Sequence, residues 1–248
     1  MAWLVDHGPL VASPPLPMSA LRALVNSNRI MRLRRSLYLV PRASGRLPSL
    51  YEAINLVDPE GYISGHGALS MHFMTDQDVC RWYSVSSRRQ GDIRYGPFEV
   101  HFVFSPARAA TATKTTVAGD YDVYQASVAS VTQAFVDEVS LMPDGLDWYT
   151  VARMLGKALA TQRTSAFEIA SVLSKRPSMA SARRLGFMIE MITGIRDPAL
   201  FAMACMNKDA TPIASGETLA RGGPAYISDW RLSIPCSPDF VRMAGRDW

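Results

Sequence analysis

Residues 18–41 read MSALRALVNSNRIMRLRRSLYLVP, and this stretch decides the fold that we expect at the N-terminus. Its first half places apolar residues at helical spacing, which predicts an amphipathic helix over residues 18–28. Met18, Leu21, Leu24 and Val25 form the apolar stripe of that helix. Asn28 tolerates the left-handed backbone conformation that often ends a helix.

The second half of the stretch predicts a β-hairpin. Residues 30–33 and 37–40 are two short apolar runs, and a basic turn separates them. Pro41 ends the second run, because proline has no backbone N–H to donate to a sheet. A helix followed at once by a basic hairpin is typical of a winged helix, in which the helix reads DNA bases and the hairpin, or wing, binds phosphates.

The charge distribution also favours a nucleic-acid partner for the N-terminus. The net charge of the chain is +4, but residues 1–46 hold seven arginines against one acidic residue, Asp6, and so carry +6. Residues 47–248 hold 19 basic and 21 acidic residues, a balance of −2. A positive excess confined to one segment indicates a polyanionic partner for that segment. Arginine is suited to bidentate contacts with phosphate and guanine.

We expect the DNA contacts to come from one helix face, from the wing and from the chain beside it. Arg22 and Asn26 would approach base edges, and Ser19 would bond a phosphate or a base. The predicted contact residues are Ser19, Arg22, Asn26, Arg29, Arg32, Arg34, Arg35, Arg42 and Arg46. Binding to about six phosphates would make the affinity fall steeply with salt. A solvated basic surface without a DNA-binding role is the other interpretation of these residues.

The rest of the chain predicts an α+β fold. We expect strands over residues 79–86, 98–104 and 120–126, polar loops over 87–96 and 105–119, and a helix over 65–74 that Ser64 caps; residues 51–57 fit a helix or a strand. Further helices are expected over 128–141, 148–161, 165–173, 178–193 and 198–206, with a closing strand over 226–234. The predicted organisation is a winged helix-turn-helix domain over residues 1–46 and a larger mixed α/β domain over residues 47–248 that is helical towards its C-terminus.

Composition disfavours several other classes of protein. Hydrophobic residues make up 48% of the chain and charged residues 19%, which is typical of a globular protein. No apolar run approaches the roughly 18 residues of a membrane span, and we expect no signal peptide. Cys80, Cys205 and Cys236 are far apart and form no Cys-x-x-Cys pair, which disfavours disulfides and a zinc finger and favours a reducing, cytoplasmic setting.

Few residues have a spacing typical of catalysis, so we expect no enzyme, no metal and no cofactor. His66 and His72 lie six residues apart and would not share a helix face as paired metal ligands do. Asp120 and Asp122 would share a strand face and could hold Mg²⁺, but the Gly-Ser phosphate cradle of a nucleotidyltransferase is missing upstream. Residues 183–184, both arginine, would bind a phosphate or an acidic partner, or would lie on a solvated helix face.

Five short segments resemble the AbiEi family of bacterial antitoxins and transcriptional regulators, and they follow the order of that family. Residues 28–38 (NRIMRLRRSLY) are similar to the family's wing, and residues 61–72 (GYISGHGALSMH) to its strand-to-helix motif. The other three are the helix that follows a strand (126–143), an Arg-Arg-Leu-Gly helix (182–190) and a closing strand (230–232). The five segments fall in the family's order within residues 20–235, which is most of the chain.

This resemblance implies an N-terminal winged helix joined to a larger antitoxin domain. It implies repression of the protein's own operon at inverted repeats, where a dimer would supply two copies, and neutralisation of a nucleotidyltransferase-like toxin encoded next to it. The chain departs from the family at Ser36, where the wing usually has glycine, and at residues 127–130 (SVAS), which replace a Ser-Pro-Glu-Arg-like opening. Prolines in residues 9–17 leave room for only a short first helix, such as residues 2–7.

Three functions therefore stay open from the sequence. The first is a non-enzymatic antitoxin that binds operator DNA. The second is a magnesium-dependent nucleotidyltransferase or nuclease that uses Asp120 and Asp122. The third is a protein-only interaction module whose basic N-terminus binds an acidic partner and retains that partner in the presence of competing DNA.

Overall fold

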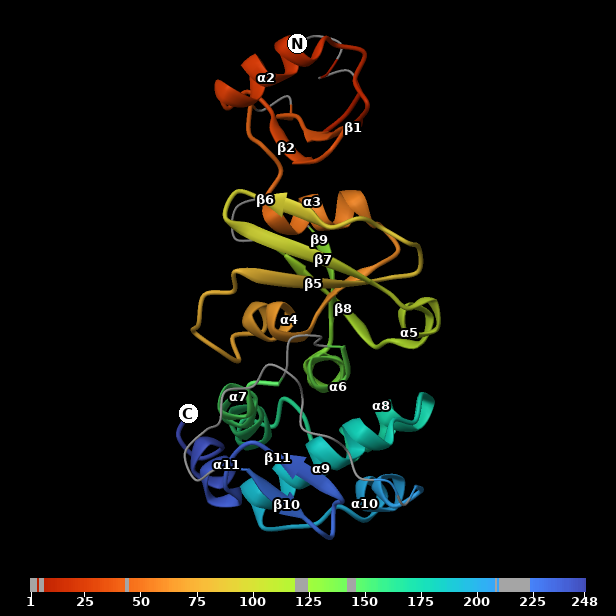
Figure 1. Ribbon diagram of the computed structural model, residues 1–248, viewed down its shortest axis with the longest axis vertical. Helices are drawn as coiled ribbons and strands as arrows, with labels where there is room; N and C mark the ends of the chain where they lie inside the picture. Colours follow the sequence, from red (N-terminus) through yellow and green to blue (C-terminus); the bar gives the residue numbers. More distant parts are fainter. Residues whose placement is uncertain are drawn as a thin grey trace. The chain divides into compact units, whose positions relative to one another are not determined.

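The computed structural model describes residues 4, 7–42, 45–118, 125–141, 146–207, 209 and 224–248. Helices and strands both contribute, which confirms the predicted α+β class (Figure 1). The chain divides into two compact units. Unit 1 comprises Met1–Ile63, Asp78–Ala110 and Thr115–Val128, and unit 2 comprises Ser64–Gln77, Thr111–Lys114 and Ala129–Trp248. The domain boundary predicted at residue 46 lies inside unit 1.

The described part of unit 1 begins with a small sheet and the helix α2, in the chain order β1 (Leu10–Ala12), α2 (Met18–Asn26), β2 (Met31–Arg34) and β3 (Leu37–Leu39). The sheet has the order β1-β3-β2, and β3 pairs antiparallel with both neighbours. The helix and the hairpin predicted from residues 18–40 are therefore confirmed. Asn28 (φ 54°) and Ser36 (φ 60°) have left-handed backbone conformations where the helix and the first hairpin strand end.

A small apolar core holds this helix against the sheet. Leu21 of α2 is buried together with Val11, Ile30 and Tyr38, and Leu24 and Val25 pack against this core from the same helix. Met18 was expected in the apolar stripe but is 53% exposed. Met18 is the first residue of α2, where the helix has no preceding turn to pack beside it.

The rest of unit 1 is built on a six-stranded sheet of order β6-β7-β5-β4-β9-β8 (Figure 1). Its strands are β4 (Tyr62–Ser64), β5 (Arg81–Ser86), β6 (Ile93–Tyr95), β7 (Phe98–Phe104), β8 (Lys114–Ala118) and β9 (Gln125–Ala129). β5 pairs parallel with β7, and β4 pairs parallel with β9. The ambiguous residues 51–57 form a helix, α3 (Leu50–Val57), which a capping box of Ser49 and Glu52 begins.

Two loop predictions for this part of the chain were wrong. Residues 87–96 contain β6, which pairs antiparallel with β7, and residues 105–119 contain α5 (Pro106–Thr111) and β8. Each of these elements is only three to six residues long, so the apolar periodicity that marks a strand or helix is weak. The strand predicted over residues 120–126 lies mostly outside the described residues, and β9 begins at Gln125.

Unit 2 is mainly helical, as predicted. Its helices are α4 (Gly65–Met71), α6 (Val131–Leu141), α7 (Trp148–Ala160), α8 (Ala166–Lys175), α9 (Met179–Thr193), α10 (Pro198–Ala204) and α11 (Pro238–Ala244). Helix α9 contacts α6, α7, α8, α10 and α11, and is therefore the central helix of this unit. Across the described ranges, no helix has both the length and the apolar character needed to cross a membrane.

The C-terminal strand predicted over residues 226–234 is a hairpin of β10 (Ala225–Ile227) and β11 (Leu232–Ile234). Trp230 lies in its connection and is almost fully buried, and its indole N–H donates to Glu190 Oε2 at 2.6 Å. Gly186 on α9 leaves the space for this ring. A Cβ at Gly186 would lie 2.3 Å from the nearest atom of Trp230.

We predict that Gly186→Ala lowers the free energy of unfolding by about 1–3 kcal/mol, because the added methyl group overpacks the site of Trp230. Urea denaturation followed by tryptophan fluorescence measures this change. The control is Ser171→Ala on the exposed face of α8, where we expect a change within about 0.5 kcal/mol. Equal stabilities of the two variants would contradict the close packing of α9 against Trp230.

Candidate nucleic-acid interface

The outward face of α2 brings together the three helix residues predicted to contact DNA. Ser19, Arg22 and Asn26 are three and four positions apart, so they lie on one side of the helix. All three are exposed, while Leu21 points into the core. Arg22 makes no hydrogen bond or ion pair with any residue that the structure describes.

The three arginines of the β2–β3 hairpin differ in their exposure and in their partners. Arg32 and Arg35 are exposed, whereas Arg34 is half-buried. The Nη1 of Arg34 donates to the backbone carbonyl of Gly91, and its Nη2 lies 3.5 Å from Gln90 Oε1. The structure thus gives Arg34 a partner within the protein in place of the predicted phosphate.

A register shift in the hairpin accompanies this difference. The pairing of β2 with β3 is irregular between Arg32 and Arg34, as in a β-bulge. A bulge redirects the side chains that follow it, so strict alternation of the two faces is lost. The sequence carried no signal for the partner of Arg34, because Gln90 and Gly91 lie more than 50 residues away along the chain.

The flanking arginines also differ from one another. Arg29 is exposed and has no ion pair within the described part of the chain. Arg42 forms an ion pair with Glu52 at 2.5 Å, and the Glu52 side chain is only 7% exposed. Glu52 therefore offsets the charge of Arg42, and Arg46 is exposed beside them.

The result is an exposed cationic surface on the helix and the hairpin. Residues 7–42 contain six arginines and no acidic residue. The exposed arginines without an acidic partner in the described ranges are Arg22, Arg29, Arg32 and Arg35. Because Arg34 and Arg42 are engaged within the protein, the number of phosphates that we expect the protein to bind falls from about six to about four. Such a surface has a positive potential that attracts polyanions.

Unit 2 contains a separate buried polar network that joins α4 to α6. Ser64 Oγ donates to Asp137 Oδ2 at 2.5 Å, and Gln133 Nε2 donates to Asp137 Oδ1 at 2.8 Å. All three side chains are buried. Ser64 occupies the N-cap position of α4, but its hydroxyl does not cap the helix. The predicted capping role was wrong, because the hydroxyl bonds to Asp137 instead.

His66 and Glu138 lie next to this network. His66 Nδ1 is 3.9 Å from Glu138 Oε1, and Glu138 Oε2 is buried without a hydrogen-bond partner among the described residues. Burial raises the pKa of Glu138 to about 7; a backbone hydrogen bond from His66 opposes this rise, and the charges of Asp147 and Asp137 add to it. Burial lowers the pKa of His66, and Asp147 partly offsets that effect.

These shifts favour the neutral forms of both groups near neutral pH, so the network serves packing between α4 and α6. His72 does not join His66, since His72 Nε2 contacts the backbone carbonyl of Ala129 at 2.8 Å. The described residues contain no group of three or more His, Cys, Asp or Glu side chains that could hold a metal ion. Asp120 and Asp122 lie outside the described residues.

The two arginines of α9 are engaged by backbone carbonyls. Arg183 is 3% exposed, and its guanidinium donates to the carbonyls of Ala204 at 2.9 Å and Asn207 at 2.8 Å, and to that of Asp209. Arg184 Nη1 donates to the carbonyl of Val139 at 2.8 Å. Both arginines fix neighbouring segments of unit 2, so neither the phosphate site nor the solvated helix face expected here is present.

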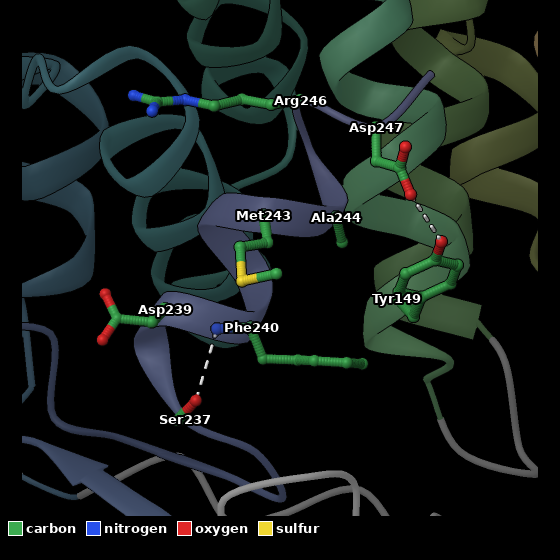
Figure 2. A pocket seen from close by; sticks show the side chains of 8 residues that line it. All are labelled: Tyr149, Ser237, Asp239, Phe240, Met243, Ala244, Arg246 and Asp247. Carbon is green, nitrogen blue, oxygen red and sulfur yellow. Dashed lines mark hydrogen bonds between the residues drawn. The ribbon is translucent and has the colours of Figure 1, made fainter.

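A pocket of about 740 Å³ lies between α7 and α11 in unit 2 (Figure 2). Several polar groups on its wall bond to one another or to nearby residues. Tyr149 donates to Asp247 at 3.3 Å, and Ser237 Oγ accepts the N–H of Phe240 as the cap of α11. Figure 2 shows the side chain of Arg246 extending away from Tyr149. The pocket thus offers a mainly apolar surface.

Comparisons with known proteins support the fold and no more than the fold. No protein-family model matches the chain, and no curated protein matches it either. Among solved structures, the crystal structure of the RV2827C protein from Mycobacterium tuberculosis is similar, with a TM-score of 0.60 and 15% sequence identity. The match covers 98% of this chain and 92% of that one, so the likeness extends over both units.

We predict that Glu138→Gln makes the protein more stable than the wild type at pH 8 and not at pH 4. Because the pKa of Glu138 is raised in the folded protein, protonated Glu138 contributes its full share of the free energy of unfolding below pH 4.5, its ordinary pKa. This stabilisation is lost as the pH rises towards about 7. Glutamine stays neutral throughout, so the difference in the free energy of unfolding should grow to about 3 kcal/mol across this range.

Urea titrations at several pH values measure this difference. His66, Asp137 and Asp147 face Glu138 in both proteins, so their contributions to stability largely cancel in the comparison. Glu168→Gln, at an exposed position in the first turn of α8, is the matched control and should show no such growth. A difference between wild type and Glu138→Gln that is constant from pH 4 to pH 8 would contradict the raised pKa.

Proposed function

We propose that this protein is a DNA-binding regulator that binds DNA with the outward face of α2 and the β2–β3 hairpin. The observation that supports this proposal best is the set of four exposed arginines on these elements, none of which has an acidic partner in the described ranges. Arg22 would approach base edges together with Asn26 and Ser19. Arg32 and Arg35 would bind phosphates from the hairpin, with Arg29 beside them.

In this proposal the N-terminal elements act as a winged helix. A strand, a helix and a hairpin that pairs with the first strand, in the order β1-β3-β2, support it. The helix would enter the major groove with its outward face, since a B-DNA major groove accepts one α-helix. The hairpin would act as the wing. Arg34 and Arg42 would support the surface from within the protein and would not contact DNA.

The antitoxin role is part of the same proposal and depends on the resemblance to the AbiEi family. The protein would bind inverted repeats in its own operator as a dimer and would neutralise a nucleotidyltransferase-like toxin through residues 47–248. It would act without catalysing a reaction.

We predict that Arg35→Ala reduces the salt dependence of DNA binding and that Arg22→Ala reduces the preference for a specific sequence. Each lost phosphate contact lowers the slope of log affinity against log salt by about one. Arg22 would contact a base, so its loss lowers the preference for a specific sequence, whereas loss of Arg35 weakens binding to all sequences alike. Fluorescence-anisotropy titrations from 50 to 200 mM salt, about the range over which such contacts dominate, measure both effects.

Arg242→Ala is the matched control for lost charge. Arg242 lies in unit 2 and forms an ion pair with Asp239 at 2.8 Å. Its loss removes one positive charge from the chain and should leave the slope unchanged. If Arg22→Ala and Arg35→Ala behave as Arg242→Ala does, then α2 and the hairpin do not bind DNA, and the protein-only module becomes the better account.

A further inference from the structure

The connection between β5 and β6, residues 87–92, is held rigidly at its start. Ser86 Oγ accepts the N–H of Arg88 at 3.1 Å and donates to the carbonyl of the same residue at 2.6 Å. Glu60 accepts from Ser87 Oγ at 2.9 Å and from Arg88 Nη2 at 2.8 Å. The charge of Arg88 is therefore offset by Glu60.

The far end of this connection is held as well. Arg34 of the hairpin bonds to Gly91 and Gln90, and β2 packs against β6. Asp92 accepts from the backbone N–H of Phe102 at 3.1 Å, and its other oxygen lies 2.8 Å from His101 Nδ1. These contacts fix the connection beside the hairpin, within unit 1.

Arg89 is the charged residue of the connection that these contacts leave unpaired within the described part of the chain. Its guanidinium carbon lies 5.1 Å from the centre of the Phe104 ring. Arg89 is exposed, and Phe104 is 47% exposed, which is high for a phenylalanine. A ring face attracts a cation and restricts its motion, while the N–H groups at the edge of the guanidinium stay available to an oxygen ligand.

We propose that Arg89, held on the ring of Phe104, binds a DNA phosphate next to the β2–β3 hairpin. This inference depends on the proposed function and extends its interface from the hairpin to the β5–β6 connection. Arg34 of the hairpin bonds to Gly91, and Arg89 is only two residues away from Gly91 along the chain. This bond also explains why an arginine of the hairpin is engaged with the protein: Arg34 ties the second phosphate-binding segment to the first.

The test compares salt slopes for double-stranded DNA among the wild type and four variants. Arg89→Ala should lower the slope by about one relative to the wild type, as Arg35→Ala does. Arg89→Lys keeps the charge and should keep the wild-type slope. Arg94→Ala is the matched control from the neighbouring strand, because Arg94 is exposed but forms an ion pair with Glu99 at 2.6 Å, and it should leave the slope unchanged.

The outcomes distinguish a failure of the role of Arg89 from a failure of the proposed DNA-binding function. A lowered slope in Arg35→Ala together with an unchanged slope in Arg89→Ala overturns the role of Arg89 and leaves the DNA-binding proposal intact. Equal losses in Arg89→Ala and Arg94→Ala also overturn it, since the effect would then reflect net charge alone. An unchanged slope in both Arg35→Ala and Arg89→Ala, together with an unchanged sequence preference in Arg22→Ala, overturns the DNA-binding proposal itself.

Discussion

The proposed interface depends on the burial of Leu21, which lies on the inner face of α2. Side chains on a helix repeat every 3.6 residues, so the burial of Leu21 fixes the rotation of α2 about its axis and directs Arg22 and Asn26 outward. Ile30 and Tyr38 complete the same core from the hairpin. Burying a large apolar side chain contributes about 1.5–3 kcal/mol, which a rotated helix would lose. The same apolar contacts therefore hold the helix and present its polar face.

The arginines show how much of the candidate site could be predicted from sequence. The helix face at Ser19, Arg22 and Asn26 was predictable, because the apolar stripe opposite it fixes which residues face solvent. The partners of Arg34 and Arg42 were not, since Gly91 and Glu52 are brought close only by the tertiary fold. A guanidinium that loses water on burial needs acceptors inside the protein, and a sequence shows the donor without showing the acceptor.

The same division holds for the fold. Long helices with strong periodicity, such as α7 and α9, were predictable to within a few residues of their ends. Short elements such as β6, β8 and α11 were missed, because three to seven residues carry little periodic signal. Trp230 illustrates the remaining difficulty: an apolar residue between two strands reads as part of one strand, but its ring fills the space above Gly186, and the chain turns there.

A gel-shift titration of the full chain on its own upstream DNA tests the central claim most directly. Wild-type protein would be titrated at one salt concentration against DNA from immediately upstream of its gene and against unrelated DNA of the same length. The account predicts a retarded complex at a protein concentration at least about tenfold lower on the upstream DNA, since specific sites usually bind far more tightly than random ones. Equal affinities for the two DNAs, or no retarded band on either, would contradict it.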